Sequence, residues 1–239
     1  MQTTLGQFNE VETDQAFTLQ NSKLLKIELD QVTVQSKAGA MVAYQGDVTF
    51  EHAGSGGMGR MLKKAVTGEG TQLMKITGTG EVFFADTAQD IHLIYLENDS
   101  ITVNGPNLLA FDSTIDWDIN RIQGGGAGAM AGGLFNMSLK GTGWVAILSD
   151  GPPVLLDVSS APTFADAQAA ITWSSGVSVG LKTDFKMKNL IGRGSGESVQ
   201  LAFTGQGWVL VQPSEGRITA AAAQGGGSSG GGLGNLLNG

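Results

Sequence analysis

The chain of 239 residues contains no cysteine. It therefore cannot form a disulfide framework, bind a metal through thiolates or use a cysteine nucleophile. Basic residues are also scarce, with 14 Lys and Arg against 22 Asp and Glu, and the formal net charge is −8. Because nucleic-acid-binding proteins gain affinity from a basic surface, this balance argues against a nucleic-acid partner.

Signals for targeting and membrane insertion are lacking as well. No run of about 18 apolar residues occurs, so the sequence predicts no transmembrane helix. The first residues are polar and include Glu10, Glu12 and Asp14. They differ from the apolar core of a secretory signal and from an arginine-rich mitochondrial presequence. We therefore expect a soluble, cytoplasmic protein.

The rest of the composition is that of a folded protein, because 41% of the residues are hydrophobic and only 15% are charged. Glycine is abundant, with 37 residues, whereas proline is rare, with 5. Many glycines together with many β-branched residues favour an all-β protein with tight corners.

A Gly-x-Gly phrase followed by x-Val occurs three times and begins at Gly78, Gly141 and Gly205, at intervals of 63 and 64 residues. The apolar run that follows each copy, such as residues 144–148, predicts a strand buried on both faces. Apolar and polar residues alternate before the phrase, as in residues 135–140, which indicates a half-buried strand. Glycines at such a junction mark a bulge or a bend, so each copy is predicted to join two β segments through a glycine corner.

The repeat extends beyond the glycines. Each phrase is preceded by an aromatic residue that ends an apolar segment: Phe50, Trp117 and Trp173. Further upstream, each copy has a segment in which apolar and polar residues alternate: residues 25–29, 91–96 and 154–158. The chain is therefore predicted to contain three β modules, residues 17–88, 89–150 and 151–216, between an N-terminal arm (1–16) and a flexible Gly-rich tail (217–239). A unit of about 65 residues buries little surface alone, so we expect the modules to pack as one globular unit.

These segments carry a resemblance to a known family. Residues 38–44 and 62–69, the three Gly-x-Gly strands and the Gly-rich tail resemble the altered-inheritance-of-mitochondria family, which is linked to mitochondrial biogenesis. The resemblance covers nearly all of residues 17–216. The resemblance implies tandem β-sandwich modules whose fold is similar to that of the tryptophan RNA-binding attenuation protein. It also implies that the chains of this family commonly assemble as a trimer. Because no presequence pattern is present, the mitochondrial role is not expected to carry over.

Two segments match motifs of cofactor binding and catalysis, but the secondary structure expected around them does not fit either motif. Residues 54–59 match G-x-G-x-x-G, but the helix expected at residues 60–66 is too short for a dinucleotide fold. Residues 227–231 match G-x-S-x-G inside a low-complexity tail, where no strand or helix frames a nucleophile. The resemblance brings no catalytic residues either. We therefore expect a non-enzymatic protein with no cofactor.

Metal-binding and aromatic patterns favour structural roles. His52 and His92 lack the spacing of a zinc motif. Asp112, Asp116 and Asp118 lack the spacing of a calcium loop, and we interpret them as the solvated face of a strand. No metal site is predicted. The four tryptophans recur with the repeat and are predicted to anchor the core: Trp117, Trp144, Trp173 and Trp208.

The first module has a local basic spot in an acidic chain. A glycine loop there precedes the expected short helix, whose N-terminal amides and lysines suit an anion or an acidic partner. The candidate contacts are Gly56, Gly57, Gly59, Arg60, Lys63 and Lys64. The alternative is that the lysines only solvate the helix.

Three functions are compared on this basis. The first is a self-assembling β-sandwich homotrimer with a scaffold or interaction role, which contacts a protein partner or a membrane surface through its Gly/Met-rich loops, residues 54–59 and 124–133. The second is a module that binds a small anionic ligand or a nucleotide. The third is an RNA-binding ring by analogy of fold, which the acidic charge disfavours.

Overall fold

The computed structural model describes residues 3–52, 72–121, 135–181 and 200–214. Within these ranges the chain forms β-strands and two short 3-10 helices, without an α-helix. The elements are η1 Leu5–Phe8, β1 Phe17–Asn21, β2 Leu24–Lys37, β3 Met41–His52, β4 Leu73–Phe84, β5 Asp90–Asn104, η2 Gly105–Asn107, β6 Leu108–Asp112, β7 Asp116–Arg121, β8 Phe135–Ser149, β9 Val154–Asp157, β10 Thr163–Asp166, β11 Ala170–Ser174, β12 Val177–Leu181, β13 Gln200–Gly205 and β14 Trp208–Val211. The helices in these ranges are too short to cross a membrane.

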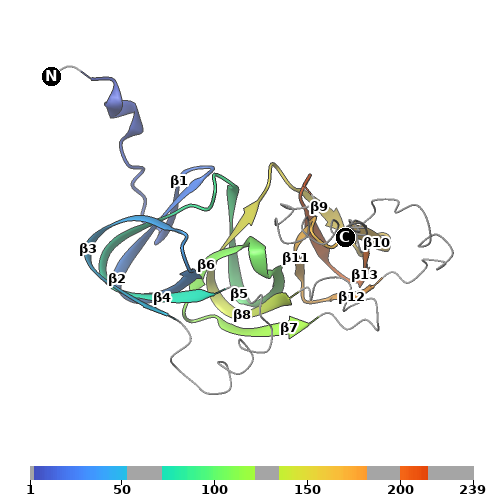
Figure 1. Ribbon diagram of the computed structural model, residues 1–239. Coiled ribbons are helices and arrows are strands. Elements are labelled where there is room, and N and C mark those ends of the chain that lie inside the picture. Colours follow the sequence, from blue (N-terminus) through green and yellow to red (C-terminus); the bar gives the residue numbers. More distant parts are fainter. Residues whose placement is uncertain (1–2, 53–71, 122–134, 182–199, 215–239) are drawn as a thin grey trace, which may run out of the picture.

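Eleven of the strands form one sheet, in the order β3-β4-β2-β6-β8-β5-β11-β14-β9, with β1 added to β2 and β7 added to β8. The other three form a small sheet in the order β10-β13-β12. Every strand pair is antiparallel. Strands β1–β4 gather at one end of the molecule and β9–β14 at the other (Figure 1). The prediction of an all-β fold is confirmed.

Each strand that carries a Gly-x-Gly phrase lies between strands from its own part of the chain. Strand β4 pairs with β2 and β3, and β8 pairs with β5, β6 and β7. In the C-terminal part, β14 pairs with β9 and β11, whereas β13 pairs with β10 and β12. The helix expected at residues 60–66 and the tail lie outside the described residues.

The glycine corners have the backbone geometry that the sequence predicts. All six glycines of the phrases have φ between +117° and +149°, which other residues rarely adopt. Strands β4 and β8 nevertheless run through their corners as single bent strands, and only the third corner, at Gly205 and Gly207, separates two strands, β13 and β14. The prediction of two β segments at each corner is therefore right in form only for the third copy.

The core consists mainly of branched and phenylalanine side chains. Val82, Phe83 and Phe84 are buried on both faces of β4, as are residues 145–148 of β8. Burial weakens in β14, where Val209 is buried but its neighbours are half-buried. Of the four tryptophans predicted to anchor the core, Trp173 is 4% exposed, whereas Trp117, Trp144 and Trp208 are half-buried and pack against the core from its margin.

Candidate functional site

The anion site predicted from the sequence lies outside the described residues. Its members, Gly56, Gly57, Gly59, Arg60, Lys63 and Lys64, all fall within residues 53–71, and the second Gly/Met-rich loop falls within residues 122–134. That site stays a prediction. The described residues bring together a different group, which is centred on a lysine of β2.

Lys26 is a buried cation on the first long strand. Its side chain is only 3% exposed. Leu25 and Ile27, on either side, point to the opposite face of the sheet and are fully buried in the core. Lys26 pairs with Thr18 of β1 and with Phe83 of β4, so all three side chains share one face. The sheet therefore places the positive charge of Lys26 on a face that another segment must cover.

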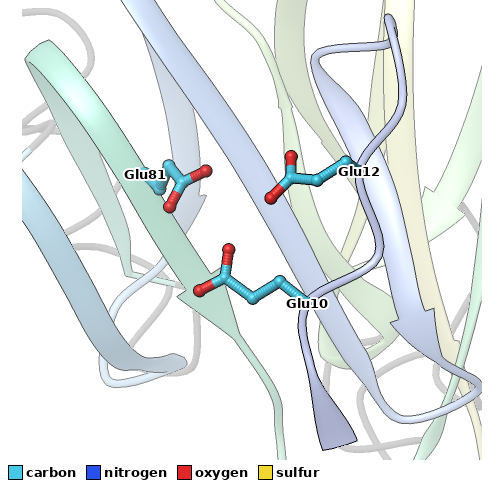
Figure 2. A group of neighbouring side chains, drawn as sticks. All are labelled: Glu10, Glu12 and Glu81. Atoms are coloured by element: carbon cyan, nitrogen blue, oxygen red, sulfur yellow. The ribbon is translucent and has the colours of Figure 1, made fainter. Parts of the chain in front are cut away.

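The cover comes from residues 10–13 of the N-terminal arm, here called the strap. The Lys26 ammonium donates a hydrogen bond of 2.9 Å to Glu12 and one of 2.8 Å to Glu81 of β4. The Glu10 carboxylate lies 3.5 Å from the same nitrogen. Figure 2 shows the three carboxylates turned toward one another, with Glu10 and Glu12 on the strap and Glu81 on the neighbouring strand.

The strap is held by polar side chains of three strands. Gln20 of β1 binds the backbone of Val11 twice, because its carbonyl oxygen accepts from the Val11 amide at 2.7 Å and its amide donates to the Val11 carbonyl at 3.0 Å. Gln20 lies at a register shift between β1 and β2. Such a bulge re-aims a side chain, here toward the strap. Gln45 of β3 adds a hydrogen bond of 3.2 Å to Glu10.

A lysine already partly balances the charge of the carboxylates in this group. Burial alone would lower the pKa of Lys26, but hydrogen bonds to Glu81 and Glu12 outweigh it and leave the pKa raised. The lysine is therefore a permanent cation at neutral pH. Because its ammonium already contacts all three carboxylates, it supplies the charge that a bound metal would otherwise provide.

A Ser–His pair elsewhere in the sheet has the wrong proton arrangement for a nucleophile and its base. His92 Nε2 lies 2.7 Å from Ser149 Oγ, and the Ser149 hydroxyl donates its only proton to the Gly151 carbonyl at 2.7 Å. The imidazole must then donate to the serine, so Nε2 cannot accept the serine proton. Burial lowers the pKa of His92, and the nearby Asp90 opposes that shift.

The three aspartates near Trp117 do not act as one group. Asp112 accepts a hydrogen bond of 2.6 Å from the backbone amide of Trp144, across the second glycine corner. Burial raises the pKa of Asp112, although the bond from Trp144 opposes the shift. Asp116 and Asp118 lie exposed on β7. The predicted solvated face is therefore right for these two and wrong for Asp112.

Comparison with known proteins now defines the family. The family model described as mitochondrial biogenesis AIM24 matches residues 17–214. The chain belongs to the AIM24 family. A Streptococcus pyogenes protein of known crystal structure has a similar fold, with a TM-score of 0.68 and 22% identity over 83% of this chain and 92% of that one. No curated protein matches the sequence.

The family match begins at Phe17, so the strap lies N-terminal to the part of the chain that it covers. Sequence reasoning on this AIM24-family chain missed Lys26 and Gln20 because a lysine in an alternating strand normally points to solvent. The available signal was the pair of glutamates two residues apart, Glu10 and Glu12, in the acidic arm. In an extended segment such a pair projects to one side, where it can meet a cation.

Proposed function

We propose that this AIM24-family protein is a non-enzymatic, self-assembling scaffold that forms a closed homotrimer through the edges of its large sheet. The observation that carries the proposal is strand β3. It has 12 residues and, among the described residues, pairs only with β4. Residues 42–47 are exposed on both faces, and they include Val42 at 56% and Tyr44 at 50%. A long edge with exposed apolar side chains favours pairing with another chain.

The opposite edge of the sheet supports a head-to-tail contact. Strand β9 ends the strand order there, with Val154 53% and Leu155 60% exposed. An interface between two different edges generates a ring when its rotation closes, and closure leaves neither edge free. We further propose that the three parts of the chain are copies of one β module, so that a trimer presents nine related modules around its axis.

The non-enzymatic part of the proposal is supported by the chemistry of the described polar clusters. Lys26 is neutralised by carboxylates, and the Ser149 proton is committed to Gly151. Neither group offers an activated nucleophile beside a free base. A turnover screen with ester, phosphoester and glycoside substrates is expected to give only background rates.

Light scattering of the full chain at micromolar concentration tests the assembly. We expect a mass of about 74 kDa, which corresponds to three chains of 24.7 kDa. The double variant Val42→Lys/Tyr44→Lys should shift the mass toward the monomer, because two charges then lie at the proposed contact. Thr49→Lys/Glu51→Gln, on the part of β3 beyond residues 42–47, adds the same two units of positive charge and should keep the trimer. A wild-type monomer would contradict the proposal.

A further inference from the structure

The strap is bound in the way that proteins bind extended peptides. Gln20 contacts the backbone of Val11 through both its donor and its acceptor, a contact that any residue at that position could make. The residues on either side, Glu10 and Glu12, both reach Lys26, whereas the Val11 side chain is exposed. Side chains that point alternately toward the sheet and toward solvent are typical of an extended segment, and here the acidic side chains point toward the sheet.

The surface that binds the strap belongs to the folded sheet, whereas the strap itself is held by polar contacts. Lys26 and Thr18 are buried, and Thr18 Oγ1 lies 2.5 Å from Thr13 Oγ1. Residues 3–16 are all exposed, so burial of apolar side chains contributes little to holding the strap. The tip of the arm, with exposed Leu5 and Phe8, projects away from the body (Figure 1).

We propose that the surface formed by Lys26, Gln20 and Thr18 is a binding site for an extended acidic peptide of the form Glu-x-Glu from a protein partner, and that the strap occupies it as a competitor from the same chain. Charge complementarity selects this occupant, because the buried ammonium of Lys26 lies where two carboxylates spaced two residues apart converge. Gln20 fixes the peptide backbone between them. This site adjoins the β3 edge of the proposed trimer, because Gln45 of β3 also contacts Glu10 of the strap.

Two features set the expected strength of binding. Glu81 already shares the ammonium, so a peptide meets partly neutralised charge and its affinity should be modest and sensitive to salt. The strap is joined to the body by a short connection, which gives it an effective concentration on the order of millimolar. A partner therefore binds when the strap is weakened or drawn away.

The test uses the full chain with the strap weakened by Glu10→Gln/Glu12→Gln, here called the opened variant. The probe is a synthetic peptide with the sequence of residues 6–15, and the matched probe carries Gln at both Glu positions. In an NMR titration, the acidic peptide should bind the opened variant at least about tenfold more tightly than the wild type, with shifts at Lys26 and Gln20. The Gln peptide should bind at least about tenfold more weakly than the acidic one.

Two further variants keep the test decisive. Lys26→Met in the opened variant should abolish the preference for the acidic peptide, and Gln20→Ala, which truncates a half-buried side chain of β1, should weaken both peptides by about tenfold. Absence of binding to a folded opened variant, or equal affinity for both peptides, would overturn the proposal. A change in the mass of the opened variant would show that arms exchange between copies, and would overturn the assigned partner.

Discussion

The two ends of the molecule use the same glycine phrase to different effect. At the N-terminal end, β2, β3 and β4 have 14, 12 and 12 residues, and β4 passes unbroken through its corner at Gly78 and Gly80. At the C-terminal end the strands have at most six residues within the described ranges, and the corner at Gly205 and Gly207 divides β13 from β14. The Gly-x-Gly phrase therefore specifies a change in the direction of the backbone. The neighbouring strand determines whether β pairing continues across that corner.

The neighbours differ at the level of backbone contact. At the first corner, Gly46 of β3 pairs directly with Gly80, so two backbones approach without side chains between them. At the third corner, the serine side chain of Ser174 accepts the Trp208 amide at 3.0 Å instead. A side-chain cap alone does not end a strand, because Asp112 caps the Trp144 amide at the second corner, where β8 continues through its ladder with β5.

The largest effect should come from filling the first corner. A Cβ at Gly80 would meet the backbone carbonyl oxygen of Gln45, which cannot rotate away, and φ is +142°. We expect Gly80→Ala to lower the free energy of unfolding by about 3 kcal/mol. At Gly207 the Cβ would meet the Ser174 side chain, which can move, so Gly207→Ala should cost about 2 kcal/mol.

Denaturant unfolding measures both values, with Gly180→Ala as the control. A Cβ at Gly180 has open space around it and should change stability by less than about 0.5 kcal/mol. If Gly207→Ala proved more costly than Gly80→Ala, the distinction between backbone and side-chain contact at the two corners would be wrong.

The second effect concerns the strap, which has no counterpart at the C-terminal end among the described residues. Lys26→Met should lower stability by about 2 kcal/mol, because carboxylates that converge on the ammonium lose their partner. Backbone amides of residues 10–13 should then exchange with solvent faster. Lys23→Met is the matched control: its side chain is 46% exposed and its ammonium pairs with Asp90, so the loss should stay below about 1 kcal/mol. Equal losses of stability in the two variants would show that burial among the carboxylates does not make Lys26 more important than Lys23.

The sequence was sufficient to predict the all-β fold and the glycine corners, but not the continuity of β4 and β8 through their corners or the equivalence of the third part. By spacing, Trp173 was matched with Trp117. In the sheet, Trp173 pairs with Val209, directly after the tryptophan that follows the corner, and Phe111 occupies the same place opposite Val145. Trp117 pairs instead with Leu139, before the corner. Trp173 is therefore the counterpart of Phe111, and both side chains are buried.

The strap site escaped prediction for a different reason. Alternation along β2 shows that Lys26 is opposite Leu25 and Ile27, but it cannot show that a segment from outside the strand covers that face. Burial of a lysine depends on pairing with carboxylates that are remote in sequence, here Glu81 as well as the strap. Local patterns contain no information on such a pair.

A third, smaller effect compares the caps of the second and third corners. Asp112 accepts the amide of Trp144 as Ser174 accepts that of Trp208. Ser174→Ala should cost about 1 kcal/mol, the usual value of one hydrogen bond. Asp112→Asn keeps an acceptor and should cost less at neutral pH, because it also removes a charge that burial disfavours.

The pH dependence separates these two caps. The pKa of Asp112 is raised above 3.8 in the folded state, so its favourable contribution is complete below pH 3.8 and is lost as the pH rises through the folded pKa. The stability of the wild type relative to Asp112→Asn should therefore decline as the pH rises from 3.8 toward neutral. Ser174→Ala should show no such slope. A flat difference for Asp112→Asn would mean that the carboxyl is hydrated in the folded protein.

The smallest effect should come from His92, whose neighbours partly compensate for its burial. Burial lowers its folded pKa below 6.5, against the opposing charge of Asp90. The unfolded chain therefore binds a proton first as the pH falls, so stability is complete above pH 6.5 and is lost as the pH falls through the folded pKa. His92→Gln should remove this slope while retaining a donor toward Ser149. If the slope persisted in that variant, another group would carry it, and the imidazole would be protonated in the folded state as readily as in the unfolded chain.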